Sequence, residues 1–157
     1  MSDSVRAIGS LQTELKEGKM SDGTAKVSAT PADLVRDYAD AGARDDFEAM
    51  EALRHREWQE AWPQSGEIVA NSANYRTVRT QRPEGAPRVE PRRVGGSGDC
   101  WWSESIVHYA DGSRWLAVSI YELRDGLVWR ERVYFGQPVK APAWRAPWVE
   151  REEPAVS

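Results

Sequence analysis

The residue best suited to acid–base chemistry in this sequence is a glutamate in its last extended segment. Over residues 127–136, strand alternation places Glu131 on one face with three apolar side chains, Trp129, Val133 and Phe135. A carboxyl group among apolar neighbours loses solvation, which raises its pKa and makes it a candidate general acid or base. An ion pair with an arginine, or a position at the rim of the sheet, would explain Glu131 without any chemistry.

A second candidate, Tyr38, lies on the apolar stripe of a predicted helix together with Leu34 and Ala41. A buried tyrosine hydroxyl requires a hydrogen-bond partner, so Tyr38 is a candidate proton donor beside Glu131. The alternative is a tyrosine that only fills the core.

The sequence lacks the residue patterns of metal sites, of nucleophilic hydrolases and of nucleotide-binding loops. The two histidines, His55 and His108, and the single cysteine, Cys100, do not have zinc-ligand spacing, so we expect no metal and no other cofactor. The sequence contains no Gly-x-Ser-x-Gly nucleophile motif and no Gly-Lys-Ser/Thr phosphate loop. The sequence therefore gives no motif evidence for nucleophilic hydrolysis or for nucleotide binding.

The composition favours one soluble domain. The chain has 157 residues, 40% of them hydrophobic, which is enough for one core but not for two. Its 25 acidic and 21 basic residues give a net charge of -4, which argues against nucleic acid as a partner. No apolar run approaches the roughly 18 residues of a membrane helix, and no signal peptide is visible. We therefore expect no membrane partner and a cytoplasmic location.

Two helices are predicted to come first and to position these candidates. Thr30, Pro31 and Asp33 combine a capping hydroxyl, a proline at the first helical position and an acid in the first turn. After Gly42, the pair Asp45 and Glu48 begins a second helix that ends near His55.

Beyond these helices the sequence predicts mainly strands. A strand is expected at 57–62, and a third helix within 67–82. Turn residues then separate four strands of a meander, at 88–95, 100–110, 114–124 and 127–136. Three prolines in Pro138–Pro147 exclude a central strand, so this segment is expected to wrap around the domain surface.

These elements divide the chain into a flexible N-terminal tail at 1–28, one folded domain at 29–150 and a C-terminal tail at 151–157. The opening Met1-Ser2-Asp3 recurs as Met20-Ser21-Asp22. The sequence leaves open which of the two methionines begins the protein.

The order of these elements resembles that of the nuclear-transport-factor-2-like superfamily, in particular its SnoaL-like branch. The segment DLVRDYADAGARDDFEAMEAL resembles the opening helix pair of the family, AWPQSGE its first strand and turn, and YELRDGLVWRERVYFGQP its closing hairpin. APAWRAPWVE resembles a tail of uncharacterised bacterial members. The resemblance implies an α+β fold, a cone-shaped roll in which a strongly curved antiparallel sheet packs against two to three N-terminal helices.

In that family the sheet and the helices enclose a pocket, and the outer face of the sheet commonly forms a homodimer. The resemblance implies that the pocket of this chain is lined by Tyr38, Trp62, Ser103, Ser105, Ser119, Trp129, Glu131 and Val133. Glu131 would then be the only ionisable group in the pocket wall.

The active residues of the characterised members are mostly replaced. Tyr38 falls where the steroid isomerases have their oxyanion tyrosine, but Trp62 stands in place of their general base and Ser119 in place of their second oxyanion acid. Where limonene-epoxide-hydrolase-type members have arginine and aspartate, this chain has Ser103, Ser105 and Val133. The resemblance therefore carries neither mechanism over.

Two hypotheses follow for the function. The first is a small-molecule-binding SnoaL-like protein whose Glu131 and Tyr38 carry out acid–base catalysis, of an isomerase, cyclase or hydratase kind, on a small apolar or aromatic molecule. The second is a non-catalytic dimeric interaction module whose cavity is filled by some of the eight tryptophans. An open cavity would favour the first hypothesis.

Overall fold

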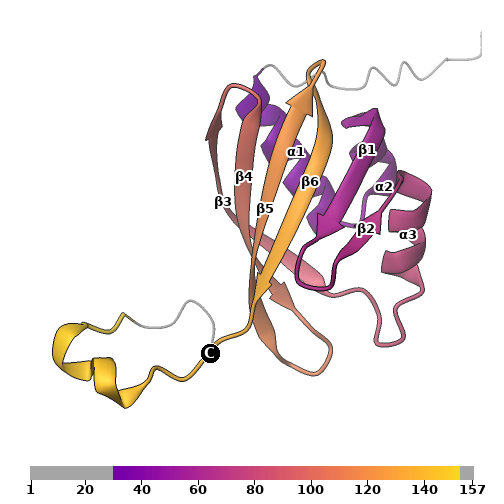
Figure 1. Cartoon of the computed structure of the whole chain (residues 1–157). Helices are drawn as coiled ribbons and strands as arrows, with labels where there is room; N and C mark the ends of the chain where they lie inside the picture. The colour runs from indigo at the N-terminus through magenta and orange to yellow at the C-terminus, as the bar shows by residue number, and fades with distance from the viewer. Residues whose placement is uncertain (1–29, 153–157) are drawn as a thin grey trace, which may run out of the picture.

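The computed structural model describes residues 30–152 of the chain. These residues form a curved six-stranded sheet with helices packed over its inner face (Figure 1). The order of the strands is β2-β1-β6-β5-β4-β3, so the sheet stays open, with β2 and β3 as its edges. The predicted N-terminal tail and residues 153–157 lie outside the described part.

The two predicted opening helices are present. Helix α1 (Pro31–Ala43) begins at Thr30, whose hydroxyl oxygen accepts a hydrogen bond of 3.2 Å from the backbone N–H of Asp33. Helix α2 (Phe47–Ala52) begins at Asp46, whose carboxylate accepts from the N–H of Ala49 at 3.0 Å. The buried stripe of α1, which includes Tyr38, packs against the sheet.

The segment after α2 differs from the prediction. The second helix ends at Ala52 instead of near His55, because strand β1 (Arg54–Trp62) begins at once and pairs with the last strand of the chain. Strand β2 (Glu67–Val69) then occupies the start of the predicted third helix. Helix α3 (Ser72–Thr80) begins only after Asn71, whose side chain accepts from the N–H of Asn74 at 2.9 Å.

The predicted meander is confirmed. Its strands are β3 (Arg88–Ser97), β4 (Cys100–His108), β5 (Arg114–Arg124) and β6 (Leu127–Gly136), and each pairs antiparallel with the next. The α+β class is confirmed as well. The sheet is mostly antiparallel, as expected, and the one parallel pair among the described strands, β1 with β6, brings Glu60 opposite Glu131.

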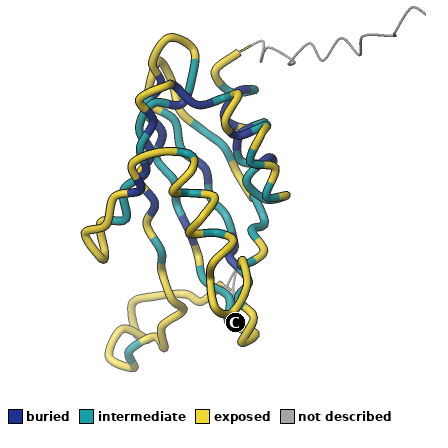
Figure 2. The backbone as a smooth tube through the Cα atoms, turned by 90° about the vertical axis from the view of Figure 1, so that its right-hand side faces the viewer, coloured by how far each residue is buried: buried dark blue, intermediate teal, exposed yellow. Residues whose placement is uncertain are grey.

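The core lies between α1, α2 and the inner face of the sheet. Figure 2 shows the buried backbone concentrated where these layers meet. Val35 and Val128 are completely buried, and Trp58, Tyr121 and Leu123 belong to the same apolar cluster. Burial of this cluster provides the main driving force for the arrangement of helices on sheet.

The C-terminal segment does not wrap around the domain, contrary to the prediction. After β6 it leaves the sheet, forms a short 3-10 helix η1 (Ala143–Trp148) and stands clear of the folded body (Figure 1). Its tryptophans Trp144 and Trp148 are 69% and 77% exposed. Within residues 30–152, no helix is long and apolar enough to cross a membrane.

Candidate functional site

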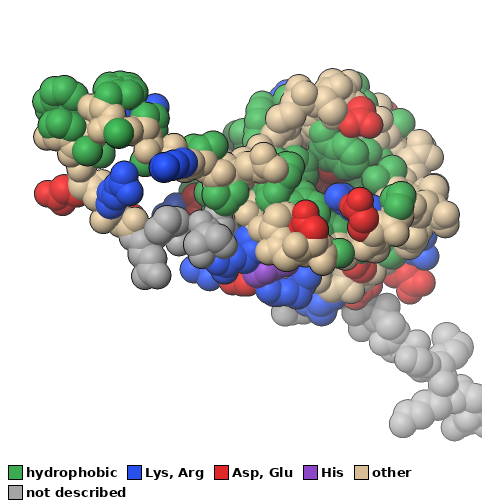
Figure 3. Space-filling model, turned by 90° about the horizontal axis from the view of Figure 1, so that it is seen from below, with side chains coloured by type: hydrophobic (Ala, Val, Ile, Leu, Met, Phe, Trp, Pro, Cys, Tyr) green, Lys and Arg blue, Asp and Glu red, His purple; other side chains and the backbone are tan. Residues whose placement is uncertain are grey.

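A cavity of about 390 Å³ lies between the helices and the inner face of the sheet. Seen from below, the molecule is hollowed, and hydrophobic side chains gather in the hollow (Figure 3). Aromatic residues from both layers contribute to the wall, namely Tyr38, Trp62, Tyr75, Tyr109, Trp115, Tyr121 and Phe135. A wall of this kind suits a small apolar or aromatic ligand.

Most of the residues predicted for the pocket meet in this cavity. The seven that do are Tyr38, Trp62, Ser103, Ser105, Ser119, Glu131 and Val133. The hydroxyls of Ser103 and Tyr121 are 2.8 Å apart and hydrogen-bond to each other across β4 and β5. Ser103, Ser105 and Ser119 together form a polar strip on one wall of the cavity.

Trp129 is the exception, and its predicted place in the cavity wall is wrong. The pairing of β5 with β6 shifts by one residue here, because Leu123 lies opposite Val128 whereas Glu122 lies opposite Arg130. Trp129 is therefore the extra residue of a β-bulge. Val128, which is completely buried, takes the inward position that regular alternation had assigned to Trp129. The indole of Trp129 lies instead against the guanidinium of Arg130.

The cavity wall holds a second buried carboxyl group that the sequence prediction missed. Glu60 is 5% exposed and Glu131 is 7% exposed, and the two are direct neighbours across the parallel pair β1 and β6. The prediction that Glu131 is the only ionisable group of the wall is therefore wrong. Glu60 alternates with Trp58 and Trp62, which is the same pattern of a carboxyl between apolar residues that singled out Glu131.

Both carboxyl groups have a raised pKa. Burial and the neighbouring charge of Glu131 raise the pKa of Glu60 to about 8. Burial raises the pKa of Glu131 too, but the positive charge of Arg54 and hydrogen bonds from Tyr38 and Ser119 oppose that rise. The carboxyl of Glu60 accepts a hydrogen bond from the indole N–H of Trp62, which opposes the rise of its pKa without cancelling it.

The hydroxyl of Tyr38 links Arg54 to Glu131. Arg54 donates from Nε to the Tyr38 oxygen at 2.7 Å. Since a guanidinium cannot accept, the single hydrogen of Tyr38 is directed to Oε2 of Glu131, 3.0 Å away. In this arrangement Tyr38 donates to the carboxyl group of Glu131. Its own pKa is raised well above the ordinary value by burial and by Glu131, so the hydroxyl keeps its hydrogen.

Arg54 is held in place by aromatic rings. The guanidinium carbon lies 3.5 Å from the ring centre of Trp58 and 4.4 Å from that of Tyr75. Its Nη1 donates to the hydroxyl of Ser72 at 3.3 Å. The side chain lies behind the cavity wall, where its charge acts on Glu131 through Tyr38.

A solved structure decides the family. A nuclear-transport-factor-2-like protein of unknown function from Burkholderia xenovorans LB400 is 33% identical in sequence, with a TM-score of 0.69. The match covers 78% of this chain and 95% of that one. This chain belongs to the nuclear-transport-factor-2-like family.

Other solved structures share the nuclear-transport-factor-2-like fold at lower identity. A candidate ketosteroid isomerase from Kribbella flavida DSM 17836 is 24% identical over 80% of this chain and 92% of that one, with a TM-score of 0.71. An LEH-like epoxide hydrolase of M. tuberculosis is 17% identical over 67% of this chain and 81% of that one, with a TM-score of 0.54. No protein-family model matches the chain, and no curated protein matches it.

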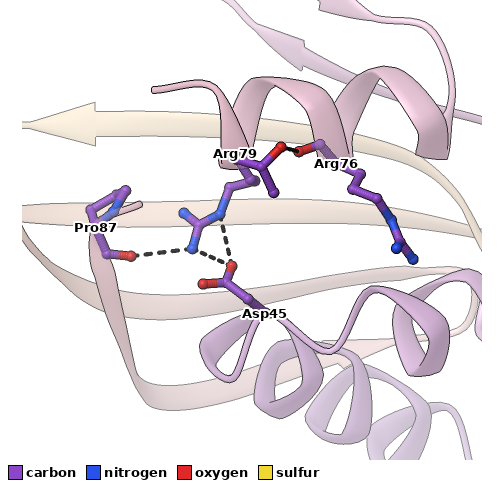
Figure 4. A network of polar contacts seen from close by, with 5 residues as sticks. Asp45, Arg76, Arg79 and Pro87 are labelled. Atoms are coloured by element: carbon purple, nitrogen blue, oxygen red, sulfur yellow. Dashed lines mark hydrogen bonds and ion pairs between the residues drawn. The ribbon is translucent and has the colours of Figure 1, made fainter. Parts of the chain in front are cut away.

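Two residues that line the cavity in this nuclear-transport-factor-2-like domain, Arg79 and Pro87, belong to a hydrogen-bond network with Asp45 (Figure 4). Arg79 of α3 donates from Nε to the carboxylate of Asp45 at 2.9 Å and from Nη2 to the carbonyl oxygen of Pro87 at 3.2 Å. These bonds connect the turn after α1, helix α3 and the approach to β3. The network thus fixes the position of α3, which has no buried residue of its own.

Proposed function

We propose that this protein binds a small apolar or aromatic molecule and moves a proton on it by acid–base catalysis. The observation that carries the proposal is the side-by-side placement of Glu60 and Glu131 in the wall of an aromatic cavity. One group of the pair is a carboxylate that accepts a proton, and the other is a carboxylic acid that donates one. Both are needed to shift a proton from one atom of a ligand to another.

The reaction class that fits this pair is an isomerisation. Glu131 takes a proton from a carbon of the ligand, and the electron pair of the broken C–H bond moves into an adjacent unsaturated group. Glu60 supplies a proton to the far end of that group. Passage of the proton from Glu131 to Glu60 then restores the starting state, so no outside reactant is consumed.

The cavity supports this proposal by its size and by its wall. Its volume of about 390 Å³ lies within the ~300 to 1,000 Å³ range of small-molecule sites. Trp62 and Trp115 lie in the wall and leave this volume open, which favours ligand binding over a cavity filled by tryptophans. A cytoplasmic location stays a prediction of the sequence.

A generic proton-abstraction substrate tests the proposal. 5-Nitrobenzisoxazole loses one C–H proton to a base and opens to a coloured phenolate, which is followed by absorbance. We expect the protein to accelerate this reaction beyond free acetate at equal concentration. E131Q should lose about 100-fold or more of that acceleration, because the base is gone. E60Q should keep the greater part, because Glu131 remains ionised.

The exposed residue Glu51 on α2 provides the matched control, since E51Q removes a carboxyl at a distance from the cavity. Its rate should equal that of the unmodified protein. An E131Q variant that reacts as fast as E51Q would refute the assignment of the base.

A further inference from the structure

The C-terminal arm, residues 137–152, exposes apolar side chains that the rest of the described part, residues 30–136, does not cover. Val139 is 86% exposed, Trp144 69%, Trp148 77% and Val149 50%. The arm leaves the end of β6 and stands clear of both the sheet and the helices (Figure 1). Neighbouring exposed tryptophans are costly in water, and apolar patches of this kind mark interaction surfaces.

A second apolar surface, partly exposed but buried at Ile106, which is 5% exposed, lies on the outer face of the sheet. Strand alternation turns six apolar side chains of β4, β5 and β6 away from the cavity: Trp102, Ile106, Leu116, Val118, Ile120 and Tyr134. Leu116 is 44% exposed and Tyr134 42% exposed. We call these six residues the outer apolar face.

A groove of about 590 Å³ runs along this face. Its apolar lining comes from Ile106, Leu116 and Val118 of the outer apolar face, from Ala117 and from Pro91 of β3. The polar residues Arg92, Arg93, Glu104 and Ser105 complete the lining. The pairing of β3 with β4 shifts by one residue between Pro91 and Arg93, and a bulge of this kind bends the edge strand. The groove therefore combines an apolar floor with a contoured rim, as a docking site for bulky side chains requires.

We propose that the C-terminal arm of one copy of this chain docks on the outer apolar face of a second copy. The arm is a direct continuation of β6, which carries Tyr134 of that face two residues before the strand ends. A second copy packed on this face therefore meets the arm where it leaves the sheet. In a two-fold symmetric pair each copy gives its arm and receives the other.

The area available is sufficient for a stable pair. Each tryptophan buries about 150 to 250 Å² when covered. The two tryptophans of each arm then contribute roughly 600 to 1,000 Å² over both copies. A specific interface of standard size buries about 1,200 to 2,000 Å² in total, so the arms supply about half and the sheet faces the rest. The dimer that the family resemblance implies uses the sheet face, and the arm is an additional element of it.

Sedimentation equilibrium of the full chain over a range of concentrations tests the proposal. We expect the unmodified protein to be a dimer at micromolar concentration. The double variant W144A/W148A should weaken dimerisation at least 10-fold, and L116R should shift the protein towards the monomer. I68A removes an equally exposed apolar side chain from β2, away from the outer apolar face, and should leave the equilibrium unchanged.

Acrylamide quenching of tryptophan fluorescence gives a second measurement on the same samples. Quenching should decrease as concentration rises in the unmodified protein and should change less in W144A/W148A. A monomer at all concentrations, or a double variant with unchanged dimerisation, would overturn the proposal. So would protected arm tryptophans in a monomer, because the arm would then cover its own chain.

Discussion

The direction of one hydroxyl hydrogen organises the chemistry of the cavity. Arg54 occupies one side of the Tyr38 oxygen, so the hydrogen of Tyr38 is directed to Glu131. This bond and the charge of Arg54 favour the ionised form of Glu131. A hydrogen bond from Trp62 and the charges of Arg54 and Arg79 act in the same direction on Glu60, but burial and the charge of Glu131 outweigh them and raise its pKa to about 8. The roles proposed for the two glutamates, base for Glu131 and acid for Glu60, rest on these different neighbours.

Replacement of Arg54 by methionine should favour the protonated form of Glu131. Without the buried cation the pKa of Glu131 rises further, so both carboxyls hold protons near neutral pH. We expect a stronger infrared band of protonated carboxyl in R54M at pH 7, measured with ¹³C-labelled glutamate. R54K, which keeps the charge but not the planar stack on Trp58, should restore the band to near its original intensity.

The exposed residue Arg56 on the same strand supplies the control, because R56M removes an equal charge from solvent. An R54M band equal to that of R56M would show that Arg54 does not govern the protonation of the pair.

Residues of the site were predictable only where alternation was regular and the strand was known. Glu131 stands in a long strand bounded by clear turn residues, so its face followed from its position. Glu60 was missed although the predicted strand at 57–62 contains the alternation of Trp58, Glu60 and Trp62, so the same reasoning could have found it. Its place opposite Glu131 depends on the parallel pairing of β1 with β6, which local sequence does not record. The bulge at Trp129 depends on the partner strand, and local sequence does not record it.

At the scale of elements, the hairpin of β3 and β4 depends on a glycine. Gly96 has a φ of 145°, and a Cβ added there would lie 2.6 Å from both the carbonyl oxygen of Cys100 and the Cα of Trp101. Both neighbours are backbone atoms, so no side-chain rotation can relieve the contact. The hairpin also holds Trp101 against the core, which extends the effect of any distortion.

We therefore expect G96A to lower the free energy of unfolding by about 2 kcal/mol or more. G136A at the end of β6 is the matched control, since no atom lies within 4 Å of a Cβ added there. It should change stability by no more than about 0.5 kcal/mol. Urea denaturation of both variants gives the comparison, and equal stabilities would contradict the steric argument.

The elements themselves followed from sequence to different degrees. The four strands of the meander were predicted because aspartate–glycine and glycine-rich turns separate them and because each pairs with its neighbour in the chain. Strand β2 is only three residues long and depends on pairing with β1. The parallel pairing of β1 with β6 is a long-range contact, so no local pattern indicates it.

For the molecule as a whole, the carboxyl pair is a source of instability. Glu60 in the unfolded chain has its ordinary pKa near 4.5, and in the folded chain its pKa is about 8. Below pH 4.5 both states carry the proton and stability does not depend on this group. Between pH 4.5 and 8 only the folded state retains the proton, so stability falls as the pH rises, by at most about 1.4 kcal/mol per pH unit.

The variant E60Q should remove this pH dependence. Glutamine keeps an oxygen that accepts from the indole of Trp62 but cannot ionise. We expect the advantage of E60Q over the unmodified protein in unfolding free energy to grow by about 2 kcal/mol or more between pH 5 and pH 8. Urea denaturation at several pH values measures it, with E51Q as the control. A constant difference across this range would mean that Glu60 ionises normally in the fold.

The parallel contact between β1 and β6 also bears on how the protein matures. This contact joins the first and the last strand of the sheet in chain order. All the other strands are therefore synthesised before Glu60 and Glu131 can meet. Synthesis from the N-terminus leaves one long side of β1 without a neighbour until the very end. A product that ends before β6 would lack Glu131 and therefore the carboxyl pair. The complete site would form only once β6 has been synthesised and has paired with β1.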